Sequence, residues 1–366
     1  MDLAIVGPAQ SGKTTVFNAL AASHARHGDA RHEQLAAVKI PDERLERLAR
    51  LVEAKKVTPL ELRLHDLPTL FLPAGRHGEK GRAASGEAAE ALSRADGLIL
   101  VVRAFRRADM PHPRGDVDPG RDIDEFRSEM VLHDQGIVER RLKKLDTTVR
   151  SSRPGEREEG QREQVLLQRI RQYLEDGRSL RDSVAGRDEA KALANYGLLT
   201  LKPVLILINL DEEDIAKEAE IEGDYRGRYG SGSTFVGAMC ARLEAELGEL
   251  EPEEAAEFRR EMGATEPAAA RILAQTQEVL GLVTFYTPVG TECRAWAAPA
   301  GTTAVEAAGR IHTDMERGFI RAEAISWKEL MGIGSFAEAK KQGRLRSEGK
   351  QYVVQDGDVL HILFHV

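Results

Sequence analysis

The chain has 366 residues, of which 42% are hydrophobic and 31% are charged, a composition typical of soluble globular proteins. At about 100–200 residues per domain, this length predicts two or three domains. No apolar run approaches the ~20 residues of a membrane span, and no signal-peptide pattern opens the chain, so we expect a cytoplasmic protein. Only Cys240 and Cys293 occur, which excludes a disulfide scaffold and a Cys-rich zinc module.

The formal net charge is −8, which taken as an average argues against nucleic acid as a partner, and DNA is not expected. The charge is unevenly distributed, however. Residues 201–280 hold 8 basic and 18 acidic residues, a net −10, whereas residues 1–124 and 125–200 are each +1. An acidic chain with this distribution can still present a basic surface to RNA.

The first part of the chain alternates between strand and helix patterns. Short apolar or alternating runs predict strands at 2–6, 60–65, 98–103, 204–208 and 234–238, and helical patterns lie at 13–22 and 87–94. Strands that alternate with helices predict an α/β fold with a doubly wound, mostly parallel sheet.

A stretch of different composition lies between two of these strands. From residue 124 to about 184 the sequence is rich in Glu, Arg, Gln and Leu, with apolar residues at helical spacing. Residues 151–160 contain Pro154, Gly155 and Gly160 and predict a turn. Two long helices joined by a turn form an antiparallel helical arm, which we expect to be an insertion that projects from the sheet domain.

The last part of the chain changes again. Two short helices are predicted at 252–262 and 267–279, and after residue 281 short strand-like runs surround one helix at 303–310. The runs lie at 283–287, 294–298, 319–326, 351–355 and 359–365, a pattern typical of a small β-grasp domain. We therefore predict a P-loop domain at 1–124 and 195–280, a helical arm at 125–194 and a β-grasp domain at 281–366.

The strongest motif is a phosphate-binding loop. Residues 7–14, GPAQSGKT, match G-x-x-x-x-G-K-T between a predicted strand and a predicted helix. Glycines let backbone N–H groups converge on phosphate, Lys13 would lie beside the β/γ phosphates, and Thr14 would offer its hydroxyl to Mg²⁺. Asp66 follows the strand at 60–65, and its carboxylate is predicted to be the second group on the Mg²⁺ side of the site. The alternative is that Asp66 caps a turn or helix.

A base-recognition motif follows the strand at 204–208. GTPases carry Asn-Lys-x-Asp at this place, and this chain has Asn209, Leu210, Asp211 and Glu212. The longer side chain of Glu212 moves the carboxylate that would accept from guanine, so selectivity for guanine should weaken. The alternative is an N-cap for a helix at 211–217, and both roles are compatible.

Longer runs resemble a known family. They are residues 7–20 (GPAQSGKTTVFNAL), 38–48 (VKIPDERLERL), 117–123, 199–203, 312–322 and 348–357. Together they resemble the YchF/Obg-like ATPase family over nearly the whole chain, and residues 294–366 resemble its TGS domain. The resemblance implies an Mg²⁺-dependent NTPase that prefers ATP to GTP and binds ribosomes or rRNA through the helical arm and the TGS domain.

The resemblance also implies site residues. The phosphate loop would comprise Gly7, Gln10, Ser11, Gly12, Lys13, Thr14 and Thr15, and the base motif Asn209 and Glu212. Cys240 and Ala241 match the last nucleotide loop, although Cys240 also fits a small buried hydrophobic residue. His112 matches a family histidine implicated in hydrolysis, whereas its neighbours Pro111 and Pro113 suggest a structural loop.

Three departures affect the regions that sense the γ-phosphate. The family's Asp-x-x-Gly is DLPT at 66–69, so Thr69 replaces the glycine. No Thr lies between Ser23 and Val38 to complete the Mg²⁺ shell, and the Gly-rich segment at 75–86 is altered. Leu70 stands where related GTPases place a catalytic Gln, and there the chain matches the family, which has a hydrophobic residue at this place. Nucleotide binding is therefore predicted, while the activity stays open between a slow ATPase, a non-hydrolysing nucleotide-binding adaptor and a GTP-binding protein.

The predicted arm carries a local run of basic residues: Arg140, Arg141, Lys143, Lys144, Arg150 and Arg153. Such a run contacts rRNA phosphates in one interpretation and is a solvated helix face in the other. We expect no membrane partner.

Overall fold

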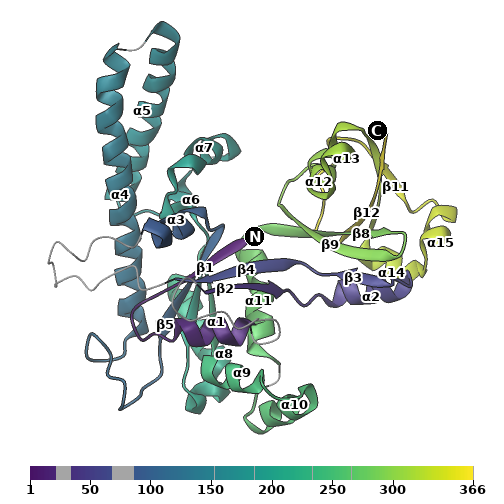
Figure 1. Cartoon of the computed structure of the whole chain (residues 1–366), viewed down its shortest axis with the longest axis horizontal. Helices are drawn as coiled ribbons and strands as arrows, with labels where there is room; N and C mark the ends of the chain where they lie inside the picture. The colour runs from purple at the N-terminus through teal and green to yellow at the C-terminus, as the bar shows by residue number, and fades with distance from the viewer. Residues whose placement is uncertain are drawn as a thin grey trace. The chain divides into compact units, whose positions relative to one another are not determined.

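The computed structural model describes residues 1–21, 34–67, 86–151, 153–184, 186–232, 234–264 and 266–365. The chain divides into two compact units (Figure 1). One comprises Met1–Ala37 and Arg63–Ala269, and the other Val38–Leu62 and Ala270–Val366. Residues 38–62, expected within the P-loop domain, thus cluster with the C-terminal residues.

The first unit is built on a six-stranded sheet. Its strand order is β2 (Gln34–Lys39), β4 (Glu61–Asp66), β1 (Asp2–Val6), β5 (Gly97–Arg103), β6 (Val204–Asn209) and β7 (Thr234–Met239). The pairs from β4 to β7 are all parallel, and β5 and β6 are buried along their whole length, as strands covered on both faces are. The predicted doubly wound α/β fold is confirmed. The carboxyl ends of these strands share one edge, where such folds bind ligands.

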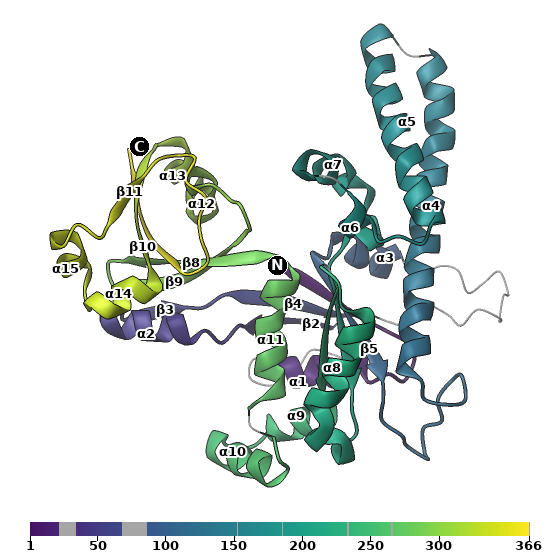
Figure 2. The ribbon, with the colours of Figure 1, turned by 180° about the vertical axis from the view of Figure 1, so that it is seen from behind.

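Helices cover the sheet of the first unit. They include α1 (Lys13–Ala21), α3 (Gly86–Arg94), α8 (Glu218–Tyr229), α9 (Ala241–Leu247) and α10 (Pro252–Glu261). α1 packs against α9, and α8 packs against β7 (Figure 2). The helix predicted at 211–217 is a 3₁₀ helix, η3 (Glu212–Lys217), which Asp211 caps by accepting the Glu212 N–H.

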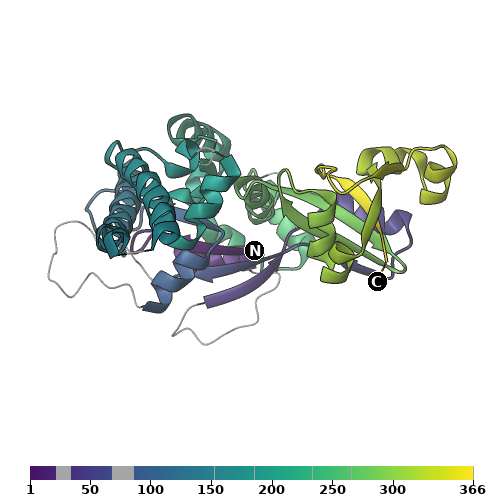
Figure 3. The ribbon, with the colours of Figure 1, turned by 90° about the horizontal axis from the view of Figure 1, so that it is seen from above.

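The arm consists of two antiparallel helices that lie side by side (Figures 1 and 3). They are α4 (Pro119–Ser151) and α5 (Pro154–Glu175), followed by α6 (Leu180–Ser183) and α7 (Gly186–Leu193). The predicted break between the two helices falls within 151–160, but the predicted turn is too long, because α4 ends at Ser151 and α5 already begins at Pro154, a residue well tolerated in the first turn. Gly160 lies inside α5, where a Cβ would stand 2.7 Å from Val149 Cγ2, so this glycine permits the helices to approach.

A buried carboxylate joins the arm to the sheet of the first unit. Asp134 of α4 has no exposed surface and accepts the backbone N–H of Leu199 at 2.9 Å and of Thr200 at 2.8 Å. The Thr200 hydroxyl donates to the same carboxylate at 2.6 Å. Both partners lie in the 3₁₀ helix η2 (Leu199–Leu201) that leads into β6, so these bonds set where α4 crosses the sheet.

The second unit contains another six-stranded sheet. Its order is β11 (Arg346–Glu348), β10 (Phe319–Ser326), β12 (Asp358–Phe364), β8 (Leu282–Val289), β9 (Glu292–Pro299) and β3 (Lys56–Thr58). β12 and β8 pair in parallel between antiparallel neighbours, and α12 (Ala304–Ile311) packs its alanines against this sheet, which is the predicted β-grasp arrangement. The remaining helices are α2 (Glu43–Leu51), α11 (Ala268–Val279), α13 (Thr313–Arg317), α14 (Trp327–Ile333) and α15 (Phe336–Lys341).

The strand predicted at 351–355 is absent from the described residues of this unit. Asp358 accepts hydrogen bonds from the Tyr352 hydroxyl at 2.7 Å and from the Gln355 N–H at 2.9 Å, which curls the segment into a turn. The edge strand is instead β11, which pairs with β10.

Residues 38–62 are held in the second unit by side chains that the C-terminal residues supply. The Tyr286 hydroxyl donates to Asp42 at 2.6 Å, and the Trp327 indole N–H donates to the Arg44 carbonyl at 2.9 Å. Arg44 also pairs with Asp356 at 2.6 Å. Burial and the bond to Asp42 raise the pKa of Tyr286, so it stays a neutral donor. α2 and β3 are therefore parts of the C-terminal unit.

Candidate nucleotide-binding site

The predicted phosphate loop joins β1 to α1 and needs both of its glycines. Gly7 has φ +151° and a Cβ there would lie 2.3 Å from the Val101 carbonyl oxygen. Gly12 has φ +88° and a Cβ there would lie 2.2 Å from Asn209 Nδ2. Gln10 also has a positive φ, +63°, a conformation that costs an L-residue roughly 1–2 kcal/mol. The loop thus keeps a strained shape, with positive φ at Gly7, Gln10 and Gly12.

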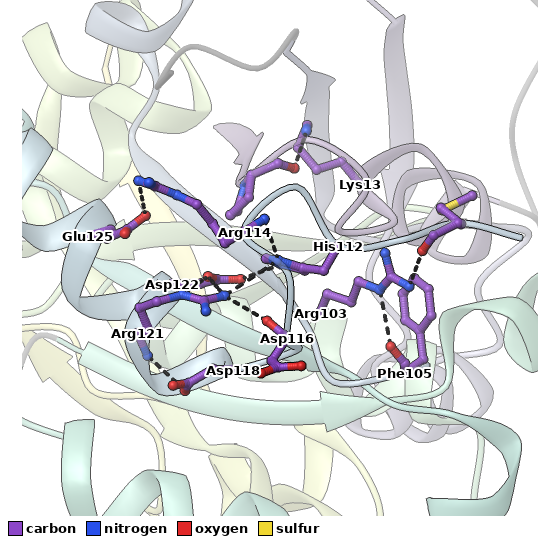
Figure 4. A network of polar contacts seen from close by, with 12 residues as sticks. Lys13, Arg103, Phe105, His112, Arg114, Asp116, Asp118, Arg121, Asp122 and Glu125 are labelled. Carbon is purple, nitrogen blue, oxygen red and sulfur yellow. Dashed lines mark hydrogen bonds and ion pairs between the residues drawn. The ribbon is translucent and has the colours of Figure 1, made fainter. Parts of the chain in front are cut away.

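The side chain of Lys13 folds back onto this loop and forms hydrogen bonds with it. Its ammonium donates to the carbonyls of Gly7 at 3.2 Å and Pro8 at 3.1 Å (Figure 4). Burial lowers the pKa of Lys13, and the carboxylate of Asp66 opposes that shift. A partly desolvated ammonium beside backbone N–H groups suits a phosphate anion.

Thr14 and Asp66 lie together as the sequence predicts. The Thr14 hydroxyl, on α1, donates to Asp66 Oδ2 at 2.7 Å, at the carboxyl end of β4. Burial raises the pKa of Asp66, while the bond from Thr14 and the charge of Lys13 lower it. A hydroxyl and a carboxylate brought together are the oxygen ligands that Mg²⁺ prefers, so these residues fit the ion. The described residues hold no group of three or more His, Cys, Asp or Glu side chains suited to a metal.

Asn209 connects two loops of the site. Its buried side chain donates from Nδ2 to the Ser11 carbonyl at 3.0 Å and accepts the Ala241 N–H on Oδ1 at 3.2 Å. The first bond reaches the phosphate loop, and the second reaches the start of α9. One amide side chain, with a donor and an acceptor in fixed positions, therefore sets the distance between these loops.

The other predicted base-side residues lie around Asn209. Glu212 begins η3 and pairs with Arg242 at 3.6 Å, with 40% of its side chain exposed. Cys240 packs in the apolar core of the first unit, and burial raises the pKa of its thiol, which agrees with the interpretation as a small buried hydrophobic residue. Ala241 contributes its backbone N–H to Asn209.

Arg103 and Phe105 also lie at this edge, and no sequence motif assigns a functional role to Arg103. The arginine ends β5 beside Asn209, which is its register partner on β6. Phe105 Cε1 lies 3.7 Å from the position that a Cβ on Gly12 would take. The sequence feature that could have drawn attention to Arg103 is its charge directly after the apolar run LILVV.

His112 lies in a buried network rather than in an open cleft (Figure 4). Its Nδ1 accepts the Arg114 N–H at 3.2 Å, so Nε2 carries the proton and donates to Asp122 at 3.1 Å. Arg121 binds the other oxygen of Asp122 at 3.0 Å. These bonds fit the structural-loop alternative, and a catalytic role would require the ring to leave them.

Comparisons with known proteins decide the family. The YchF-GTPase_C family model, described as "Protein of unknown function (DUF933)", matches residues 282–365. The chain is 33% identical to the ribosome-binding ATPase YchF of Bacillus subtilis (strain 168), over 99% of this chain and 98% of that protein. Its identity to the ribosome-binding ATPase YchF of Escherichia coli O157:H7 is 32%, with the same coverage. The chain belongs to the YchF family.

Solved structures agree with this assignment to the YchF family. The Schizosaccharomyces pombe YchF GTPase is 27% identical and superposes with a TM-score of 0.82, over 99% of this chain and 97% of that one. A GTP-binding protein from Pyrococcus horikoshii OT3 is 17% identical with a TM-score of 0.58, which is a likeness of fold alone. No helix in the described part of the chain is long and apolar enough to cross a membrane.

Several features in which this chain departs from the YchF family pattern lie outside the described residues. These are Pro68, Thr69, residues 75–85 and the switch segment at 22–33. Leu70, which matches the hydrophobic residue of the family, also lies outside the described residues. Within the described loop, Ser11 is buried and its hydroxyl has no hydrogen-bond partner, and Thr15 follows Thr14 in the first turn of α1.

The basic run on the arm of this YchF-family chain is divided between paired and unpaired side chains. Arg141 pairs with Glu163 at 2.6 Å. Four other cations of this run are exposed and form no ion pair with the described residues: Arg140, Lys143, Lys144 and Arg153. The side chain of Arg150 is outside the described residues.

Replacing Asp66 tests the electrostatics of the site. Because burial raises the pKa of Asp66, ionising this carboxyl costs folding free energy, and stability is lost as pH rises through the folded-state pKa. Asp66→Asn should therefore unfold at higher urea than the wild type at pH 7.5, and the difference should shrink toward pH 4.5, closer to the ordinary aspartate pKa of about 3.9. A variant less stable than the wild type at pH 7.5 would contradict this account.

Proposed function

We propose that this protein binds a purine nucleoside triphosphate with Mg²⁺ at the carboxyl edge of its first sheet and hydrolyses it slowly. The observation that carries the proposal is the Asn209 side chain, which ties the phosphate loop to the start of α9 while Thr14 meets Asp66. The similar bacterial proteins are named ribosome-binding ATPases, which supports the same reaction class here.

Each group has a chemical task in this proposal. The amides of the phosphate loop and the ammonium of Lys13 bind the phosphates and stabilise negative charge. Thr14 and Asp66 would hold the magnesium ion, which neutralises phosphate charge when bound. No side chain in the described residues occupies a clear position as general base, so we expect positioning and charge stabilisation to supply the catalysis and the rate to be low. His112 remains the candidate for a role in hydrolysis.

The proposed preference is for ATP over GTP. Guanine presents N1–H and an N2 amino group to a carboxylate, whereas adenine has neither donor. Glu212 is one methylene longer than aspartate and its carboxylate pairs with Arg242, so it is poorly placed to accept both guanine donors. Leu210 is buried and offers no charge to the nucleotide.

Phosphate release tests the enzyme and its preference together. With Mg²⁺, we expect hydrolysis of ATP above a Lys13→Ala control. The kcat/KM for GTP should be at least about tenfold lower than that for ATP, a difference of roughly 1.4 kcal/mol in transition-state binding. Release that does not exceed the Lys13→Ala control would contradict the proposed hydrolysis. Equal or faster turnover of GTP would contradict the role given to Glu212.

We also propose the ribosome as partner, with the arm and the TGS-like domain as contact surfaces. Its support is the names of the similar bacterial proteins and the four unpaired, exposed cations of the arm. A helix face whose cations lack carboxylate partners within the chain is free to pair with rRNA phosphates.

Sedimentation with ribosomes at several salt concentrations tests this surface. Lys143→Ala combined with Lys144→Ala should weaken binding and flatten its salt dependence, by about one unit of log–log slope per lost phosphate contact. The matched control replaces Arg162 and Arg171, exposed cations of α5 that pair with Glu158 and Glu175, and should bind as the wild type does. Equal salt slopes for all three proteins would refute the arm contact.

A further inference from the structure

Arg103 lies at the carboxyl edge of the first sheet, where it is both charged and almost completely enclosed. Its exposed fraction is 1%. A guanidinium costs much free energy to bury unless its donors are satisfied, so such a residue needs a reason in its contacts.

Two of its nitrogens hold one loop. Nε donates to the Phe105 carbonyl at 3.1 Å, and Nη2 donates to the Met110 carbonyl at 2.7 Å (Figure 4). The guanidinium carbon also lies 4.5 Å from the centroid of the Phe105 ring, a cation–π contact. Arg103 therefore clamps both ends of the segment 105–110 against the end of β5.

The clamped segment borders the phosphate loop and the base-side loop. The edge of Phe105 faces Gly12, as described above, and the backbone N–H groups of Ala104 and Arg106 donate to Asn209 and Asp211. Moving the segment would thus move the wall between the phosphate loop and the nucleoside side of the site. Met110 lies two residues before His112, so the same clamp sets where the histidine loop begins.

The third nitrogen of the Arg103 guanidinium indicates that this residue is more than a structural element. Nη1 is buried and has no hydrogen-bond partner, and Figure 4 shows it without a dashed line, on the side of the guanidinium away from the Phe105 carbonyl. Burial also lowers the pKa of Arg103. A buried donor without a partner destabilises the fold, so this arginine is not the most stabilising residue for its place.

We propose that Arg103 is a positioning residue of the nucleotide site, which acts through Phe105 to shape the nucleoside side. The inference rests on the proposed nucleotide binding. It assigns Arg103 no contact with the triphosphate, so its loss should weaken binding of the whole nucleotide and spare binding of the phosphates alone.

Calorimetric titration of the full-length chain with ATP and with inorganic tripolyphosphate, both with Mg²⁺, tests this. Arg103→Met should bind ATP about tenfold more weakly than the wild type and tripolyphosphate equally well. Arg106→Met, an exposed arginine of the same segment, is the matched control and should match the wild type with both ligands. Arg103→Lys keeps the charge but not both hydrogen bonds, so its ATP affinity should lie between those of Arg103→Met and the wild type. It replaces Arg103→Met if that variant does not fold.

Unchanged ATP affinity would overturn the inference, and so would an equal loss for ATP and tripolyphosphate, which indicates a general structural role. Added guanidinium at millimolar concentration should restore ATP binding in Arg103→Ala, and no restoration would also count against the clamp. A wild type that binds neither ligand would instead refute the proposed function, so the two failures are distinguishable.

Discussion

The arrangement of the site depends on one side chain. Asn209 ends a fully buried strand, and its amide donates to the phosphate loop and accepts from the first turn of α9. Those loops are separated by more than two hundred residues in the sequence, and neither can shift without breaking a buried hydrogen bond. The close approach of Gly12 to the same amide explains why this loop position cannot carry a side chain.

A second constraint follows from the path of the chain. α1, which carries Lys13 and Thr14, lies in the first unit, and β4, which ends at Asp66, is a strand of its sheet. The chain between them passes through the second unit, where Tyr286 and Trp327 hold α2. Thr14 and Asp66, the proposed magnesium ligands, are thus connected through a segment that folds with the C-terminal β-grasp sheet.

The sequence predicted those parts of the fold that local pattern controls. The buried strands, the phosphate loop and the pairing of Thr14 with Asp66 follow from apolar periodicity and motif spacing. The turn predicted at 151–160 was placed correctly but is too long. Pro154 and Gly160 are usual signs of a break, whereas here Pro154 starts a helix and Gly160 lets a neighbouring helix approach. The strand predicted at 351–355 does not form because hydrogen bonds to the carboxylate of Asp358 fold this segment into a turn.

The missing parts depend on contacts between residues distant in sequence. β3 is three residues long and exists because β9 offers an edge to it. Arg103 gave only the signal of a charge at the end of an apolar strand, and its function follows from the carbonyls that fold back onto it. Sequence periodicity does not predict such partners. Propensity and motif spacing therefore predict the site residues but not the groups that position them.

Hydrogen exchange of wild type and Asn209→Ala, each with and without Mg-ATP, tests the central claim most directly. In the nucleotide-free wild type, amides of the phosphate loop and of the start of α9 should be protected together. Asn209→Ala should deprotect both by similar factors while the β-grasp sheet of the second unit is unchanged. Mg-ATP should restore protection less fully in the variant. Deprotection of only one loop, or of neither, would contradict the account in which this amide holds the two together.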